Sequence, residues 1–272
     1  MREAIFIPVA EEPGDGHGRY HATVLARGPW DPRAQHGGAP AALLVHALEL
    51  LGGGDHLELA RITYEFMRPV PLGDLDVRAE RVRPGRRVQL LEASIHDADG
   101  TEVVRARALQ VRQADDVPPE AISAKPPPPR PARSASAGHL PGGERPMFGT
   151  DGCEIRLAER AGTSTDGDPP ASVAWFRLLV PLVEGVEPTP LERLAAAGDF
   201  GNGISSVLPW DDYVYINPDL TLYVEREPIG EWIGLESTTR IGDGGVGLAE
   251  SILYDERGRV GRALQSLLVA RR

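Results

Sequence analysis

Apolar and polar residues alternate along most of the chain, which predicts that it is built largely from β-strands. Between Leu59 and Met67 every second residue is apolar, namely Ile62, Tyr64 and Phe66, and the residues between these three are polar. This period of two is typical of a strand with one face buried and the other in solvent. Similar strands are expected at Ala4–Val9, Arg19–Ala26, Asp74–Val82, Arg87–Asp97, Glu102–Arg112, Glu154–Glu159, Ser172–Val180, Tyr213–Arg226, Glu231–Thr239, Val246–Asp255 and Arg259–Ala270.

Two segments depart from this alternation and predict helices. The first, residues 41–51, is apolar over much of its surface, so we expect it to be buried against a sheet. The run Gly52-Gly53-Gly54 should end this helix, because glycine is a poor helix former.

The second helical segment, residues 189–203, places a carboxylate on its buried face. Thr189 is a natural N-cap, and Glu192 three residues later completes a capping box. Asp199 continues the apolar stripe of this helix. The helix is expected to end at Gly201-Asn202-Gly203. A buried aspartate is costly unless it is hydrogen-bonded or paired. Asp199 is therefore either a structural residue satisfied by its neighbours or a functional one.

The elements before and after the proline-rich segment follow the same order: a strand, a helix and then four strands. Several residues also recur in the two halves at a separation of 158 positions. This recurrence predicts an internal duplication. We expect an N-terminal unit at 1–115, a proline-rich linker at 116–147 and a C-terminal unit at 148–272. A peptide-recognition role for the PPPPRP run is the alternative to a spacer. The matched pairs are Thr63 and Thr221, Arg68 and Arg226, Asp97 and Asp255, Gly100 and Gly258, Leu109 and Leu267, and Val111 and Val269.

Charge and composition limit the functions that the chain can have. A formal net charge of -11 argues against a general binder of nucleic acid or anionic membranes, although a local basic site for an anionic ligand is compatible with it. The single cysteine, Cys153, excludes an intramolecular disulfide, and the histidines lack metal-ligand spacing, so neither metal nor other cofactor is expected. No apolar run is long enough to span a bilayer, which favours a cytoplasmic protein without a membrane partner.

Several strings of sequence resemble the hotdog fold, duplicated in one chain as in the TesB-like acyl-CoA thioesterases. They are RGPWDPRAQHGGAPAALLVHALE and RITYEFMRPVPLGDLDVRAERVRPGRRV in the first half, and PLVEGVEPTPLERLAAAGDFGNG, INPDLTLYVEREPIGEW and LYDERGRVGRALQSLLV in the second. The resemblance covers nearly the whole chain outside the linker. It implies an α+β double hotdog with two helix-wrapped antiparallel sheets. It also implies an acyl-CoA substrate, hydrolysis of the thioester, and a type of protein in which further association into homo-oligomers is common.

The resemblance also implies a catalytic site. Members of this family carry an Asp on the second-half helix, a Thr or Ser in the following strand region and a Gln on the last strand. These positions fall on Asp199, Asn217 and Gln265. Asn217 departs from the family because an amide has no hydroxyl, and Thr221, the nearest hydroxyl, joins the candidate substrate-binding residues.

Hydrolysis without a covalent intermediate needs an oriented water, a base and donors for the carbonyl oxygen. Asp199 can supply the base, and the amides of Gln265 and Asn217 can hold the water. The alternative is that Asp199 and Gln265 only satisfy each other in the core.

The turn His36-Gly37-Gly38 is the candidate substrate-binding segment, because a helix N-terminus offers N–H groups to a carbonyl oxygen. His36 itself either contacts that carbonyl or is a loop histidine bonded to backbone. Arginines around a later turn either meet the phosphates of coenzyme A or are only solvated. These arginines are Arg81, Arg83, Arg86 and Arg87.

Two other functions remain open at this stage. One is a non-catalytic acyl-CoA or lipid-binding protein, which the substitution at Asn217 favours. The other is an enoyl-CoA hydratase, which would need an Asp/His pair in one half, and the sequence shows no such pair near Asp199.

Overall fold

The computed structural model describes residues 4–9, 16–52, 56–114, 116–122, 124–133, 145–158 and 169–272. Parts of three sequence expectations lie outside these ranges. They are the end of the first helix at Gly53-Gly54, the end of one strand at Glu159, and the middle of the linker at 134–144.

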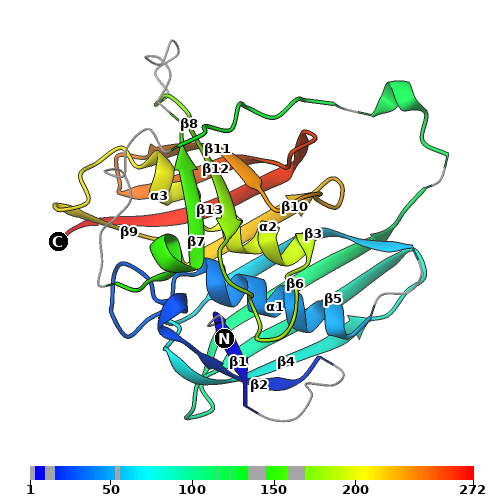
Figure 1. The fold of residues 1–272 in the computed structure, drawn as a ribbon, viewed down its shortest axis with the longest axis horizontal. Coiled ribbons are helices and arrows are strands. Elements are labelled where there is room, and N and C mark those ends of the chain that lie inside the picture. Colours follow the sequence, from blue (N-terminus) through cyan, green and yellow to red (C-terminus); the bar gives the residue numbers. More distant parts are fainter. Residues whose placement is uncertain are drawn as a thin grey trace.

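The described residues form one antiparallel sheet of thirteen strands, and Figure 1 shows the two halves of the chain side by side within it. The strand order is β1-β2-β4-β5-β6-β3-β10-β13-β12-β11-β8-β7, and β9 pairs with β13. The strands are β1 (Phe6–Pro8), β2 (Gly18–Ala22), β3 (Leu57–Phe66), β4 (Gly73–Arg83), β5 (Val88–His96), β6 (Glu102–Arg112), β7 (Cys153–Leu157), β8 (Ser172–Leu178), β9 (Tyr213–Ile216), β10 (Asp219–Val224), β11 (Ile233–Ile241), β12 (Val246–Tyr254) and β13 (Arg259–Arg271).

The expectation of two separate sheets is wrong, because β3 and β10 join the halves into one sheet. Leu220 lies opposite Tyr64, and Thr221 lies opposite Thr63. Since Thr63 and Thr221 are equivalent in the repeat, a pseudo-twofold axis passes between them, and their hydroxyls are hydrogen-bonded at 3.1 Å. The pairing also satisfies backbone groups that two separate sheets would leave open at their edges.

The separation of 158 residues between equivalent positions does not hold on β6 and β13, the closing strands of the first and second half. The reason is that the turns before these two strands differ in length. The N–H of Asp97 donates to the carbonyl of Thr101, whereas the N–H of Asp255 donates to the carbonyl of Gly258. The turn in the second half is therefore one residue shorter.

This shift changes the counterpart of Gln265. Leu91 and Ala249 occupy equivalent positions, and they pair with Ala108 and Gln265, respectively. The counterpart of Gln265 is thus Ala108 and not Arg107. The expected matches of Leu109 with Leu267 and of Val111 with Val269 are each displaced by one residue.

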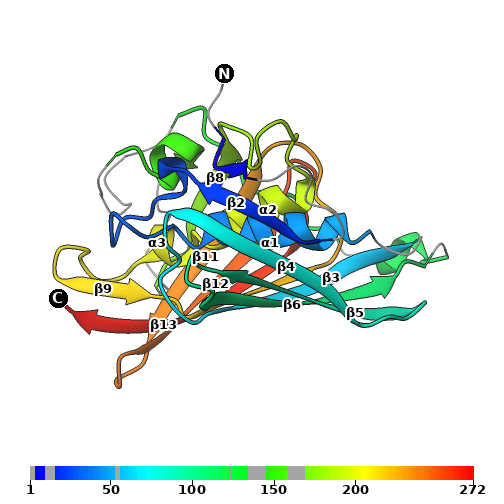
Figure 2. The same ribbon diagram turned by 90° about the horizontal axis from the view of Figure 1, so that it is seen from below.

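The helices lie together on one face of the curved sheet, as Figure 2 shows. The first helix, α1 (Gly38–Leu50), is buried from its start to Leu48, which confirms the expectation from its apolar sequence. Next to it lies α2 (Pro190–Gly198), which begins with the expected capping box of Thr189 and Glu192. The remaining helical elements are α3 (Gly201–Ser205), the 3-10 helices η1 (Val24–Ala26) and η2 (Pro119–Ala121), and the π-helical turn η3 (Phe148–Gly152).

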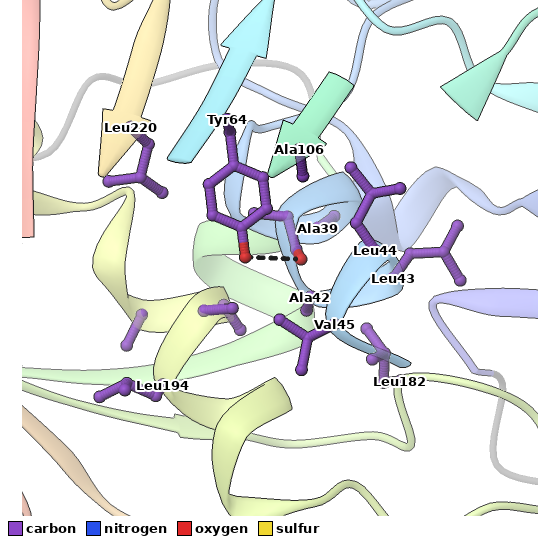
Figure 3. Packing of buried hydrophobic residues seen from close by; sticks show 14 of the residues in the cluster. Ala39, Ala42, Leu43, Leu44, Val45, Tyr64, Ala106, Leu182, Leu194 and Leu220 are labelled. Carbon is purple, nitrogen blue, oxygen red and sulfur yellow. Dashed lines mark hydrogen bonds between the residues drawn. The ribbon is translucent and has the colours of Figure 1, made fainter. Parts of the chain in front are cut away.

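The core between the helices and the sheet is shared by both halves, and Figure 3 shows its centre. Tyr64 of β3 is fully buried and donates its hydroxyl to the carbonyl of Ala41 in α1 at 3.2 Å. Leu194 of α2 and Leu220 of β10 are also fully buried in this cluster. The second half therefore packs against the first through apolar side chains as well as through the sheet.

Three element boundaries differ from the sequence expectation. The second helix does not end at Gly201–Gly203 but breaks at Asp199-Phe200 and resumes as α3. The strand expected at Tyr213–Arg226 is interrupted at Asn217-Pro218, where proline has no N–H for the ladder. The strand expected at Arg19–Ala26 ends at Ala22 and is followed by η1. Among the described residues, no helix is long and apolar enough to cross a membrane.

Candidate active site

The break between α2 and α3 places Asp199 at the centre of a polar cluster. Asp199 is the C-cap of α2, and it is 5% exposed. Gly198 just before it lies against β10, where an added Cβ would approach the side chain of Leu222 to 2.7 Å. The absence of a side chain at Gly198 thus lets the end of α2 come close to the sheet.

Two amides donate to one oxygen of the Asp199 carboxyl group. The Asn217 Nδ2 group donates to Asp199 Oδ1 at 2.8 Å, and the Gln265 Nε2 group donates to the same oxygen at 3.1 Å. Gln265 Nε2 also reaches the backbone carbonyl of Asp199 at 3.1 Å, while Gln265 Oε1 accepts from the N–H of Asn202 at 3.2 Å. Both ends of the Gln265 amide are therefore used to hold the segment around Asp199.

The first half of the chain reaches the other oxygen of this carboxyl group. His36 Nδ1 lies 3.1 Å from Asp199 Oδ2, and the N–H of Gly38 also points to the carboxyl group. The same N–H donates to His36 Nδ1 at 3.1 Å. A Cβ on Gly37 would lie 2.8 Å from Asp199 Oδ2, so this approach depends on glycine at that position.

Burial controls the protonation of both titratable groups. Burial raises the pKa of Asp199 to about 7, against the opposing effect of N–H donors from Asn217, Gly38 and Gln265. Burial also lowers the pKa of His36 to about 3, so His36 is neutral near pH 7. Because His36 Nδ1 accepts from Gly38, the neutral ring carries its proton on Nε2. A protonated Asp199 can then donate to His36 Nδ1.

A cavity of about 930 Å³ opens beside this cluster. Asp199, Asn217, His36 and Gly37 line it, whereas Gln265 lies behind the carboxyl group and does not. Most other lining side chains are apolar, among them Trp30, Phe66, Met147, Phe200 and Trp210. Asp199 is therefore not sealed in a solid core, and a large apolar molecule has space next to it.

The structure does not bring every candidate residue to this cluster. Thr221 alternates with the buried residues of β10, so its side chain lies on the opposite face of the sheet from the helices, next to Thr63. The arginines of the β4–β5 region do not line the cavity either. These are Arg81, Arg83, Arg86 and Arg87.

Sequence reasoning missed two parts of the site. The ring of Phe200 stacks on His36 with ring centroids 4.2 Å apart, and Asn202 of α3 lines the cavity and holds Gln265 through its N–H. Both follow Asp199 directly, in the segment expected to be only a helix end. The sequence also shows no Asp/His pair near Asp199, whereas the fold forms one between the halves, from Asp199 and His36.

Other chemistry has less support at this site. Cys153 lines the cavity, but burial raises the pKa of its thiol, so it is a poor nucleophile. Within the described ranges, no group of three or more His, Cys, Asp or Glu side chains is placed to bind a metal ion.

Solved structures with the same fold include several thioesterases. An acyl-CoA thioesterase II, TesB2, from Mycobacterium marinum is 15% identical, with 93% of each chain covered and a TM-score of 0.67. A candidate thioesterase from Novosphingobium aromaticivorans is 19% identical, with 97% of this chain and 98% of that chain covered and a TM-score of 0.72. A hot dog fold protein of unknown function from Alicyclobacillus acidocaldarius is 18% identical, covers 94% of this chain and 92% of its own, and has a TM-score of 0.64. At these identities the likeness establishes a hotdog fold.

Family models identify both halves of the chain, whereas a search of curated protein sequences finds no match. The model of the acyl-CoA thioesterase N-terminal domain matches residues 26–111, and that of the C-terminal domain matches residues 118–269. The second match alone covers more than half of the chain. The chain therefore belongs to the acyl-CoA thioesterase family, and it is a thioester hydrolase of that family.

Proposed function

We propose that this acyl-CoA thioesterase uses Asp199 to activate the water that attacks the thioester. The observation that carries the proposal is a buried carboxyl group with a pKa of about 7 at the wall of a large apolar cavity. A general base works best when its pKa lies near the working pH, and burial gives Asp199 that property.

The reaction balances with Asp199 as the only proton carrier. Ionised Asp199 takes a proton from water, and the water oxygen bonds to the thioester carbonyl carbon to form a tetrahedral oxyanion. When the oxyanion collapses, the C–S bond breaks, and Asp199 returns the proton to the sulfur of coenzyme A. The products are a free carboxylic acid and the thiol, and Asp199 is again ionised.

The two amides have different parts in this proposal. Gln265 donates to Asp199, accepts from Asn202 and does not line the cavity, so it orients the carboxyl group and does not contact the water. Asn217 donates to Asp199 from the cavity wall, and its side-chain carbonyl makes no hydrogen bond with the described residues. That carbonyl can accept a hydrogen bond from the attacking water, a part that needs no hydroxyl.

The start of α1 supplies the donors for the oxyanion. Gly37 lines the cavity, and its N–H donates to none of the described residues. It lies at the N-terminus of α1, where the helix dipole favours negative charge. In the tetrahedral state Asp199 holds the proton taken from water and can donate it to His36 Nδ1, so the Nε2–H group of the neutral ring, which lines the same cavity, is the second donor. Preorganised donors of this kind are worth about 3 kcal/mol each at the transition state.

Replacing Asp199 by Asn tests the proposal. Asp199→Asn keeps the size of the side chain and removes the base, so kcat on a panel of acyl-CoA substrates should fall about 1,000-fold or more. Thiol release measures the rate, and circular dichroism checks the fold. The matched control is Asp31→Asn, since Asp31 also lines the cavity but pairs with Arg33. Activity in Asp199→Asn equal to that of the control would remove Asp199 from the mechanism.

The same assay separates the alternative functions. Acyl-CoA binding by calorimetry without thiol release would identify a non-catalytic binder. The contact between His36 and Asp199 is the observation that favours an enoyl-CoA hydratase. Loss of the enoyl-thioester absorbance of crotonyl-CoA without thiol release would identify that activity.

A further inference from the structure

We propose that Arg68 recognises an anionic group of the substrate at the edge of the catalytic cavity. This inference rests on the proposed thioester hydrolysis and adds a specificity residue to it. Arg68 is exposed, lines the cavity, and makes no side-chain hydrogen bond or ion pair with the described residues. Of the other arginines that line the cavity, Arg145 is held by Asp151 at 2.8 Å, and Arg27 has partners of its own.

Comparison within the internal repeat shows that Arg68 lacks the carboxylate partner that its counterpart, Arg226, has. Arg226 forms a two-point pair with the fully buried Asp255, with Arg226 Nη2 2.6 Å from Asp255 Oδ1. In the first half, Asp97 at the equivalent position accepts from the N–H groups of Asp99 and Thr101 and forms no pair with Arg68. The Asp97 turn is therefore held by backbone donors alone, and the guanidinium of Arg68 is available to a ligand.

No carboxylate of the cavity wall neutralises Arg68. Asp31 pairs with Arg33 at 3.0 Å, and Glu154 pairs with Arg156 at 2.8 Å. Asp199 is held by the amides and His36. A guanidinium without a partner beside a substrate cavity is a site for phosphate or carboxylate, which it binds through two parallel N–H groups.

The position of Arg68 relates it to the catalytic cluster. It lies two residues beyond the end of β3, where the N–H of Phe66 donates to the carbonyl of Pro218 at 2.8 Å. Pro218 follows Asn217, the cavity-side partner of Asp199. Arg68 therefore lies on the side of the cavity that Asn217 lines, and a ligand that reaches Asp199 can extend to it.

The charge of the whole chain is unfavourable for an anionic substrate. With a formal net charge of -11, the protein repels such a substrate at long range, and a cation at the cavity offsets part of this repulsion. The anion has two sources in this reaction: a phosphate of coenzyme A, or a carboxylate at the far end of the acyl chain. Both present oxygen atoms to a guanidinium in the same way.

Charge-removing and charge-retaining variants, assayed on matched substrates, test this inference. The variants are Arg68→Met, Arg68→Lys and the control Arg257→Met, since Arg257 is exposed and lies outside the cavity. The substrates are an acyl-CoA, the same acyl group on N-acetylcysteamine, which has no phosphate, and an N-acetylcysteamine thioester whose acyl chain ends in a carboxylate.

If Arg68 binds phosphate, Arg68→Met should raise KM for the acyl-CoA about tenfold and leave kcat and the neutral N-acetylcysteamine thioester unchanged. Arg68→Lys should recover part of this loss, and added salt should weaken acyl-CoA binding in the wild type more than in Arg68→Met. If Arg68 binds an acyl-chain carboxylate, the KM increase should occur with the carboxylate-ended N-acetylcysteamine thioester instead.

Two results would overturn the inference: an unchanged KM for all three substrates, or the same increase in Arg257→Met. A fall of kcat on the neutral thioester would also overturn it, because Arg68 would then act on the catalytic cluster. These results leave the proposed hydrolysis intact, since that depends on Asp199 and is measured on the neutral thioester without any phosphate.

Discussion

The two halves of this chain share a scaffold and differ where the helix meets the closing strand. In the first half, α1 runs unbroken from Gly38 to Leu50, and the closing strand presents Ala108. In the second half, the helix breaks at Asp199, and the equivalent position of the closing strand presents Gln265. The same architecture thus holds an apolar contact in one copy and a polar cluster in the other.

The site is built from both copies, although Asp199, the base that we propose, comes from one. The second half supplies Asp199, and the first half supplies the start of α1, which faces the Asp199 carboxyl group through His36 and Gly38. The two helices meet so closely that a Cβ on Gly38 would lie 2.4 Å from the carbonyl oxygen of Ala196. The start of the uninterrupted helix α1 therefore packs against the end of α2 and contacts the Asp199 carboxyl group.

Making the second half resemble the first at the closing strand should have the largest effect. Gln265→Ala removes the amide that donates to both the carboxyl group and the backbone carbonyl of Asp199, and it leaves the N–H of Asn202 without its acceptor. The carboxyl group then loses its orientation, and kcat should fall about 100-fold, as for loss of one positioned polar group at a reacting centre. Thiol release on one acyl-CoA at saturating concentration measures this change.

The reverse replacement in the first half is the control. Ala108 is fully buried, so Ala108→Gln places a larger side chain and an amide without partners in the core. The free energy of unfolding should fall by about 2 to 4 kcal/mol, while the activity per folded molecule stays near the wild-type value. If Gln265→Ala lost only stability and kept kcat, the comparison between the halves would have no bearing on catalysis.

The pH dependence of activity should follow the titration of Asp199. The base must be ionised, and burial raises the pKa of Asp199 to about 7, so kcat/KM should rise with pH up to about 7 and then level off. A profile already flat from pH 5 upward would show that Asp199 titrates in its ordinary range and would contradict the effect of burial.

The stability of the fold should change in the opposite direction. Because folding raises the pKa of Asp199 from 3.8 to about 7, the folded state holds a proton that the unfolded chain releases between these values. The contribution of Asp199 to the free energy of unfolding therefore falls as the pH rises from about 4 to 7, by at most about 4 kcal/mol. Asp199→Asn cannot titrate, so its stability advantage over the wild type should grow from pH 5 to pH 8 in thermal melts.

The sequence predicts local patterns better than contacts between distant segments. The capping box of Thr189 and Glu192 and the buried face that carries Asp199 depend on spacing within one helix, and the structure contains both. The contact of Asp199 with His36 depends on how two helices from different halves cross, which no local spacing determines. The helix break at Asp199 was missed because Gly201 and Gly203 are typical of a helix end, whereas packing against the sheet keeps this segment helical as α3.

The two-sheet expectation failed for a related reason. A strand such as β3 alternates in the same way whether it lies at an edge or in the middle of a sheet, so its pattern does not reveal a partner. The repeat aligns Thr63 with Thr221 but does not say that they pair across an axis. The one-residue difference between the closing turns likewise became visible only from the strand register, and it changed the counterpart of Gln265 to Ala108.

The smallest change in activity is expected at the pseudo-twofold axis between Thr63 and Thr221, where the halves are most alike. Thr221→Val removes one hydroxyl from the Thr63–Thr221 pair and keeps the β-branched shape, so the free energy of unfolding should fall by about 0.5 to 1.5 kcal/mol. The side chain lies on the face of the sheet away from the helices, so kcat and KM for an acyl-CoA should stay within about twofold of the wild type. Chemical denaturation and thiol release measure the two quantities on the same preparation. A large loss of kcat would mean that Thr221 supplies the hydroxyl that Asn217 lacks, and the role proposed for the Asn217 amide would then pass to Thr221.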